Sequence, residues 1–282
     1  MTRRSLHIGM NYVDPQRYGG WNGALAGCVN DANAMRDVAV SRGFTPVRLL
    51  DGQATMEAVR EELNDAAAEL GEDDFFFLTY SGHGGQVPDE NDDEPDRYDE
   101  TWCLFDTELV DDSLYGALCT FKPGVRIFVL SDSCHSETVT RAPRIEHREE
   151  LAAQRAQVVG AKVKQAPRDV TVAEFESHRD AYKDQSTWWD PKNVIPTDAD
   201  AKVVLISGCR DYQTSMDGPT NGAFTGAFLQ VWSDGNYRGN YNDLKDAVVA
   251  QVDNSDQIPC IFSYGVDVKQ MLPQIPLSDE IA

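Results

Sequence analysis

Short apolar runs alternate with helical patterns along this chain, and that rhythm limits the folds open to it. Each run has four to eight residues and most are bounded by Asp, Gly or Pro, which is typical of buried strands. The predicted strands are 6–13, 47–50, 75–80, 102–105, 126–131 and 203–207. The predicted helices are 30–41, 55–70, 222–232 and 241–252. Such alternation predicts an α/β fold with a mostly parallel sheet and helices on both faces.

One segment interrupts this rhythm between the last two predicted strands. Residues 137–201 are rich in charge and contain few strand signals. The stretch 148–163 is a candidate helix, and the rest is predicted to be long and irregular. A connection of this length in a compact domain is usually functional or mobile.

Charge, hydropathy and cysteine usage narrow the classes of partner and the compartment. The formal net charge of −22 argues against nucleic acid as a partner, because phosphate binding needs clustered Lys and Arg. It suits basic peptides or cations, although an acid-rich solvated surface explains it equally well. No apolar run approaches the 18 residues of a membrane span, and the start of the chain lacks the apolar core of a signal peptide. The six cysteines form no CxxC pair, so we expect free thiols and a cytoplasmic protein.

Two of the predicted strands end in residues that can perform chemistry. The strand 75–80 leads into a glycine-rich turn around His83, and the strand 126–131 leads into Cys134. Ligands of open α/β sheets bind beyond the carboxyl ends of the strands, so these two side chains are predicted to meet there. An imidazole that takes the thiol proton converts a weak nucleophile into a reactive thiolate.

Two other interpretations of these residues stay open. A satisfied buried histidine beside an inert buried thiol is the plainer alternative. Zinc binding by His83, Cys134 and His135 is a further alternative, but it lacks a fourth ligand at any recognised spacing.

Several motifs occur in an order and at spacings that are characteristic of one family. They are AGCVNDA at 26–32, YSGHG at 80–84, YDE at 98–100, DSCHS at 132–136, SGCRD at 207–211 and GAFT at 222–225. With them the chain resembles the metacaspases, which are caspase-related cysteine peptidases. The resemblance covers about residues 5–265 and is weakest across 137–201. The QACxG signature of animal caspases is absent.

The resemblance implies a fold, a division of the chain and a catalytic dyad. The fold would be a caspase-like three-layer α/β/α sandwich. One catalytic domain would span 1–282, with a large-subunit-like region at 1–140, an intervening segment at 141–201 and a small-subunit-like region at 202–282. Cys134 would be the nucleophile and His83 the general base. The backbone N–H groups of Gly84 and Cys134 would stabilise the oxyanion.

The same matching implies an acidic specificity pocket. Asp31 and Asp132 match its carboxylates, and Cys28 and Ser81 match neighbouring positions. Carboxylates favour a guanidinium or an ammonium, so cleavage after Arg or Lys is predicted. The alternative for Asp31 alone is a carboxylate that stabilises a helix N-terminus. A catalytically silent binding module is the alternative function, and specificity for Asn or Asp is a further one.

No cofactor is expected for the chemistry, but calcium is a candidate activator. Asp99, Asp111 and Asp112 match a calcium site of metacaspases, whereas the fourth matching position is Arg141. A missing carboxylate weakens a site for a hard cation, so activation by calcium and a calcium-independent pairing of Arg141 with these aspartates both stay open. The acidic stretch 89–100 is not an EF-hand, because glutamate occupies the position that needs Gly.

The intervening segment is a candidate for self-cleavage by an enzyme with this preference. The basic residues that it holds include Arg141, Arg144, Arg148, Arg155, Lys162, Lys164 and Arg168. A charged helix with solvated basic residues is the alternative interpretation. We expect a monomer whose partners are protein or peptide substrates, with neither nucleic acid nor membrane among them.

Overall fold

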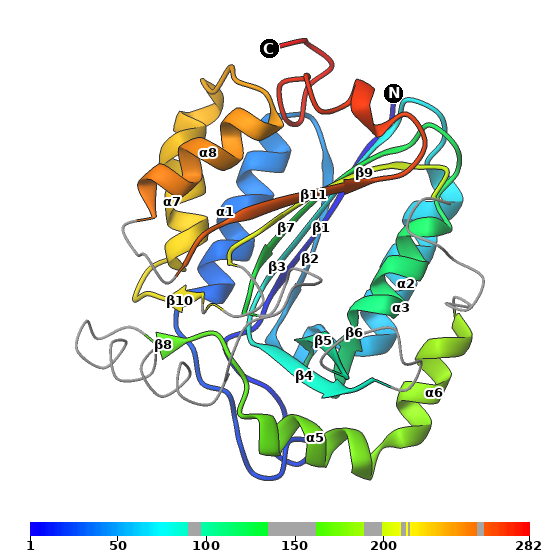
Figure 1. The fold of residues 1–282 in the computed structure, drawn as a ribbon, viewed down its shortest axis with the longest axis vertical. Coiled ribbons are helices and arrows are strands. Elements are labelled where there is room, and N and C mark those ends of the chain that lie inside the picture. Colours follow the sequence, from blue (N-terminus) through cyan, green and yellow to red (C-terminus); the bar gives the residue numbers. More distant parts are fainter. Residues whose placement is uncertain (90–96, 135–161, 189–198, 210–212, 214, 253–256) are drawn as a thin grey trace.

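A six-stranded sheet forms the centre of the protein (Figure 1), which is represented by a computed structural model. The structure describes residues 1–89, 97–134, 162–188, 199–209, 213, 215–252 and 257–282. The strand order is β11–β9–β7–β3–β1–β2, and every pair is parallel except β11 with β9. The strands are β1 (Arg3–Gly9), β2 (Thr45–Leu50), β3 (Phe75–Ser81), β7 (Arg126–Asp132), β9 (Lys202–Ser207) and β11 (Cys260–Tyr264).

Helices cover both faces of this sheet, as the alternation in the sequence predicts. Figure 1 shows α1 (Cys28–Ser41), α7 (Ala223–Trp232) and α8 (Tyr241–Gln251) on one face, and α2 (Met56–Glu69) and α3 (Asp111–Cys119) on the other. Short 3₁₀ turns are η1 (Asp51–Gln53), η3 (Ser233–Gly235) and η4 (Val268–Gln270). The predicted three-layer α/β/α arrangement with a mostly parallel sheet is therefore confirmed.

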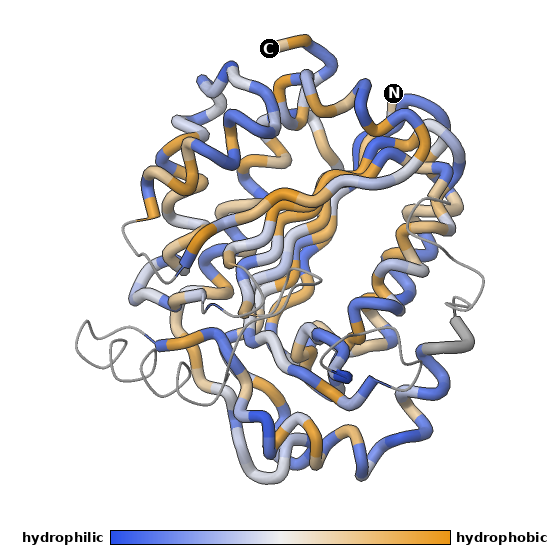
Figure 2. Tube along the Cα trace, viewed as in Figure 1, coloured by the Kyte–Doolittle hydropathy of each residue, from blue (hydrophilic) through white to orange (hydrophobic). Residues whose placement is uncertain are grey.

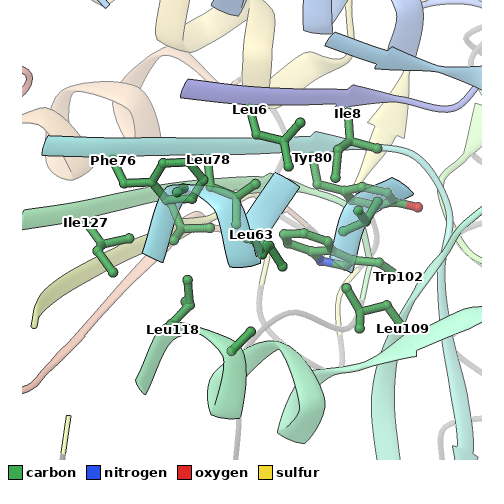
Figure 3. Packing of buried hydrophobic residues seen from close by; sticks show 14 of the residues in the cluster. Leu6, Ile8, Leu63, Phe76, Leu78, Tyr80, Trp102, Leu109, Leu118 and Ile127 are labelled. Atoms are coloured by element: carbon green, nitrogen blue, oxygen red, sulfur yellow. The ribbon is translucent and has the colours of Figure 1, made fainter. Parts of the chain in front are cut away.

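The apolar strands stay in place because each of their faces meets a different helical layer. Along β3, Phe75 and Phe77 join the cluster formed with α1, α7 and α8. Phe76 and Leu78 point the other way, into the cluster with α2 and α3 (Figure 3). The central strands form the most continuously apolar part of the trace in Figure 2. Burying a large apolar side chain contributes about 1.5–3 kcal/mol, so a strand that is apolar on both sides is held in the middle layer.

A second, smaller sheet extends the chain beyond the end of β3. It contains β4 (Gly84–Pro88), β5 (Tyr98–Cys103) and β6 (Glu108–Val110), all antiparallel. The strand predicted at 102–105 therefore belongs to this sheet and not to the parallel one. Its position places the turn that contains His83 between the two sheets.

The intervening segment is more regular than its composition predicts. It contains β8 (Lys162–Val163), α5 (Arg168–Ser177) and α6 (Arg179–Trp188). The expectation of irregular structure is wrong for α5 and α6, because polar side chains such as Thr171 and Glu174 share the buried face of α5 and hide its helical pattern. The helix predicted over 148–163 lies mostly outside the described residues, and its last two residues form β8. β8 pairs with β10 (Met216–Asp217) near the carboxyl ends of the central strands (Figure 1).

All six cysteines are free thiols. Cys28, Cys103, Cys134 and Cys209 are buried, whereas Cys119 and Cys260 are only partly so. Within the described ranges, no helix is both long enough and apolar enough to span a bilayer.

Candidate active site

The register between β3 and β7 brings the predicted histidine and cysteine to the same point of the sheet edge. Ser81 pairs with Asp132, and the Gly82 N–H donates to the carbonyl oxygen of Asp132 at 3.4 Å. His83 and Cys134 each follow two residues after this pair, and both are buried. The arrangement is the one that the carboxyl ends of two neighbouring parallel strands impose.

His83 is held in the neutral form by its surroundings. Its Nε2 lies 3.0 Å from the carbonyl oxygen of Gly23, which can only accept, so Nε2 carries the proton and Nδ1 keeps a free electron pair. The ring also packs against Trp21, with 4.8 Å between the ring centroids. Burial, assisted by the nearby Lys164 charge, lowers the pKa of His83 from 6.5 to about 4. A neutral imidazole at neutral pH can act as a proton acceptor.

Asp31 from α1 and Asp132 from the end of β7 converge on a buried lysine. The Lys164 Nζ lies 3.2 Å from Asp31 Oδ2 and 3.0 Å from Asp132 Oδ2, and its side chain has 0% exposure. Nζ also donates to Ser81 Oγ at 2.8 Å, and Ser81 in turn donates to Asp31 at 2.7 Å. Three of the four predicted pocket residues thus surround one ammonium group.

Neutral donors complete the coordination of both carboxylates. Asn221 Nδ2 donates to Asp31 at 2.8 Å, and Ser215 Oγ donates to Asp132 at 2.6 Å. Thr225 donates to Asp132 through its hydroxyl at 2.7 Å. These donors satisfy the oxygen atoms of both buried carboxylates.

The charges of the pocket support one another against the cost of burial. Burial disfavours the ammonium, yet the Asp132 and Asp31 carboxylates raise the pKa of Lys164 well above its ordinary value. Burial raises the pKa of Asp31, and the Lys164 charge opposes that rise. The pocket is therefore built to hold a cation.

The fourth predicted pocket residue, Cys28, lies at the side of this site. Burial raises the pKa of its thiol to about 12, so it stays protonated. Asp217 lies beside it and accepts the N–H groups of Ala26 at 2.7 Å and Gly27 at 3.0 Å. Asp217 thereby fixes the loop that enters α1, the helix that carries Asp31.

Two backbone donors meet on one carbonyl oxygen at the other end of Lys164. The Gly84 and Cys134 N–H groups donate to the Lys164 oxygen at 3.0 Å and 3.2 Å. These are the two donors predicted for the oxyanion. A Cβ at Gly84 would clash with the Cys134 carbonyl oxygen, so only glycine fits this position.

The sulfur of Cys134 lies against the segment around β10. The Ser215 N–H donates to Cys134 Sγ at 3.0 Å. A second thiol, Cys209, donates to the carbonyl oxygen of Ser133 at 3.3 Å. Hydrogen bonding with Cys134 and burial raise the pKa of Cys209 well above its ordinary value, so it remains a thiol.

Several residues of this site do not emerge from the sequence alone. They are Ser215, Asp217, Asn221, Thr225 and the pocket-filling Lys164. Thr225 belongs to the GAFT motif, which marks it as a candidate without giving it a role. Ser215, Asp217 and Asn221 follow no apolar strand, and Lys164 is one of ten Lys and Arg residues in its segment.

The candidate calcium ligands lie away from the pocket. Asp99 is on β5, and Asp111 and Asp112 begin α3 directly after β6. Among the described residues, no group of three or more His, Cys, Asp or Glu side chains is arranged to hold a metal ion. Arg141 and His135, which the calcium and zinc alternatives include, lie outside the described residues.

Comparisons with known proteins agree on one family. The Caspase domain model matches residues 3–269. Metacaspase-1 of Mycosarcoma maydis is 29% identical over 94% of this chain and 72% of that protein. Metacaspase-1B of Neosartorya fischeri is 28% identical over 96% of this chain and 72% of that protein.

Two solved structures share the fold. Protein GSU0716 from Geobacter sulfurreducens is 42% identical, with a TM-score of 0.84 and 99% of both chains covered. Caspase-1 from Spodoptera frugiperda is 13% identical, with a TM-score of 0.52 over 93% of this chain and 88% of that one. At that identity the second likeness concerns the fold alone.

Proposed function

The chain belongs to the Caspase domain peptidase family, and from this premise we propose that it is a cysteine endopeptidase that cleaves peptide bonds after Lys or Arg. One observation carries the proposal. The chain's own Lys164 has its ammonium between Asp31 and Asp132 and its carbonyl oxygen on two backbone N–H donors. A substrate residue before the scissile bond would need both contacts at once.

The proposed mechanism uses side chains and N–H groups from the two strand ends. His83 Nδ1 takes the proton of the Cys134 thiol, and the thiolate attacks the substrate carbonyl carbon. The Gly84 and Cys134 N–H groups stabilise the resulting oxyanion, and each such donor is typically worth about 3 kcal/mol. His83 then returns the proton to the leaving amine, and water hydrolyses the thioester.

The pocket charge supports the choice of a basic residue over an acidic one. An Asp side chain would bring a third carboxylate next to Asp31 and Asp132, which like-charge repulsion disfavours. A neutral apolar side chain would leave the two carboxylates without a cation in a buried site. Among these side chains, only an ammonium or a guanidinium brings a positive charge to the two carboxylates.

The test is hydrolysis of matched fluorogenic peptides that end in Arg, Lys, Asn or Asp, with a Cys134→Ala control. Cleavage after Arg and Lys that disappears in the control supports the proposal. Cleavage after Asp contradicts the pocket assignment. Silence of the wild-type chain in every condition contradicts the proposal and favours the alternative of a catalytically silent binding module.

The same assay tests calcium activation, which we propose as a separate property of this enzyme. Activity that requires added Ca²⁺, and that is weakened by Asp99→Asn or Asp112→Asn, supports a site at these carboxylates and Asp111. Full activity in chelator, together with no heat on calorimetric titration with Ca²⁺, contradicts it.

A further inference from the structure

A second cysteine lies beside Cys134, at the end of the neighbouring strand of the sheet. β7 and β9 are parallel, and their register pairs Ser131 with Ser207. The pairing continues past the end of β9, because the Gly208 N–H donates to the Ser131 carbonyl oxygen at 2.7 Å. Cys209 follows this glycine directly, so it and Cys134 leave adjacent strands at the same edge of the sheet.

The contacts of the two sulfur atoms place them next to each other. Cys209 Sγ donates at 3.3 Å to the carbonyl oxygen of Ser133, the carbonyl that is bonded to the Cys134 nitrogen. The two thiols also form a hydrogen bond with each other. Neighbouring strands lie about 4.8 Å apart, and disulfides join Cα atoms that are about 4.4–6.8 Å apart. A disulfide between these two cysteines is therefore compatible with the positions of the two strand ends.

Resting on the proposed function, which makes Cys134 the nucleophile, we propose that Cys134 and Cys209 form a reversible disulfide when the enzyme meets hydrogen peroxide. The disulfide switches the peptidase off and protects its nucleophile from irreversible oxidation. A thiolate that attacks a peptide carbonyl is also the form of cysteine that peroxide oxidises. Further oxidation to sulfinic and sulfonic acid is not reversed by thiols, whereas a neighbouring thiol stops the sequence at its first step.

The reaction balances with hydrogen peroxide as the oxidant. The Cys134 thiolate attacks one peroxide oxygen, the O–O bond breaks, and the departing hydroxide takes up the proton that His83 removed from the thiol. Cys134 is then a sulfenic acid. The Cys209 sulfur attacks the Cys134 sulfur, the S–O bond breaks, and the second hydroxide leaves as water with the Cys209 proton. One molecule of a dithiol such as dithiothreitol reduces the disulfide to two thiols and is itself oxidised to a cyclic disulfide.

The surroundings of Cys209 favour it over an external thiol as the partner. Cys134 and Cys209 both have 0% exposure, so a bulky thiol from solution reaches the oxidised sulfur more slowly than Cys209 does. The hydrogen bond with Cys134 is the largest cause of the raised pKa of Cys209. Oxidation of Cys134 to a neutral sulfenic acid removes the charge from that sulfur. Cys209 therefore loses its proton more readily once Cys134 has been oxidised.

Cys260 is the alternative partner within the chain and provides the matched control. It lies on β11 opposite Ser207, and its sulfur lies 2.7 Å from Ser207 Oγ. Its Sγ also donates to the Cys209 backbone oxygen at 3.8 Å. In the strand order, however, β9 separates β11 from β7, the strand that leads to Cys134. Replacement of Cys260 by Ser should therefore leave the Cys134–Cys209 disulfide intact.

The experiment treats the purified chain with hydrogen peroxide, blocks the remaining thiols with N-ethylmaleimide and maps cross-linked peptides by mass spectrometry. Wild type and Cys260→Ser are expected to show a Cys134–Cys209 peptide pair that dithiothreitol removes. Cys209→Ser and Cys209→Ala are expected to lack it and to accumulate sulfinic acid at Cys134. Pairing of Cys209 with Cys260 alone, or as much sulfinic acid in wild type as in Cys209→Ser, overturns the inference. The map of wild type decides the pairing even where a variant fails to fold.

Cleavage of fluorogenic Lys and Arg peptides is measured in the same samples, relative to the starting activity of each variant. Peroxide should abolish activity in all of them, and dithiothreitol should restore most of it in wild type and Cys260→Ser but little in Cys209→Ser. If peroxide inactivates wild type without a Cys134–Cys209 disulfide, the inference is overturned and the proposed function stands. If the disulfide forms but the reduced chain cleaves no peptide, the proposed function fails, and the regulatory role of the pair fails with it.

Discussion

The buried charge cluster of Lys164, Asp31 and Asp132 gives the sharpest quantitative prediction. The perturbation is Asp132→Asn in a Cys134→Ala background, which keeps the chain whole. At 3.0 Å and an effective dielectric constant of about 20, the Lys164–Asp132 attraction is about 5.5 kcal/mol before desolvation is subtracted. Side-chain exposures of 0% and 2% leave little solvent screening to reduce it.

Asp132→Asn is expected to lower the free energy of unfolding, because the buried Lys164 ammonium then lacks one of its two carboxylate partners. Removing one member of a buried ion pair costs about 3–5 kcal/mol of the free energy of unfolding. For chains of 150–250 residues, 1 kcal/mol shifts the melting temperature by about 2–4 °C, so a drop of roughly 10 °C is expected. Urea unfolding followed by circular dichroism provides the free energy itself.

A double-mutant cycle with Lys164→Met separates the Lys164–Asp132 interaction energy from the other effects of each substitution on stability. The two single variants should each be destabilised, and the double variant should lose clearly less than the sum, with a coupling of about 2–3 kcal/mol in this contact range. Additive losses, or a Lys164→Met variant as stable as its parent, would refute the reasoning. Lys162→Met is the matched control and should change stability by less than about 0.5 kcal/mol.

Three further outcomes follow from the site and its surroundings. Gly222→Ala should lower kcat/KM for Lys and Arg peptides about 10- to 100-fold, because overpacking costs about 1–3 kcal/mol. A Cβ at residue 222 would clash with Lys164 Nζ and Asp132 Oδ2. Gly226→Ala is the control, because its Cβ would make only an ordinary 3.9 Å contact. His83 must be neutral to accept a proton, and burial lowers its pKa from 6.5 to about 4, so activity should persist below pH 6.5 and fall only as the pH approaches 4. An acid midpoint near 6.5 in the kcat/KM profile would contradict this. Burial raises the pKa of Glu108 from 4.5 to about 8, so between these pH values the folded state keeps a proton that the unfolded state loses. The free energy of unfolding should therefore fall as pH rises from 4.5 to 8. Urea unfolding of Glu108→Gln should show a weaker dependence on pH than wild type, and an unchanged dependence would count against this assignment.

The layers of the fold could be predicted from the sequence because their signals are local. Phe75–Ser81 and Arg126–Asp132 are apolar on both faces, which predicts strands buried between two helical layers. Their ends carry His83 and Cys134, so the meeting point of the candidate dyad followed from the general geometry of parallel sheets. The polar face of α5 gives no such signal, since its burial depends on contacts with β4 that only the folded chain provides.

The occupant of the pocket could not be predicted for a different reason. Asp31 and Asp132 were candidates through the family motifs, but nothing local distinguishes Lys164 from Lys162 or Arg168. What singles it out is the backbone on either side, which pairs with Ser215 before it and with Gly84 after it. Those contacts link segments that are far apart in sequence, so they exist only after the two sheets and the loop around β10 have formed.

The presence of Lys164 in the pocket follows from one physical property of the two carboxylates. Two buried carboxylates beside each other are unstable at neutral pH unless a proton or a cation compensates them, and the Asp132 charge indeed contributes to the raised pKa of Asp31. The fold meets this requirement from within the chain by placing Lys164 there, which also brings the Lys164 carbonyl onto the oxyanion donors. Any external chain that replaces it must supply the same charge at the same distance from its scissile carbonyl. The charge that stabilises the pocket with Lys164 in place is therefore the same charge that the proposed preference for Lys or Arg requires of a substrate.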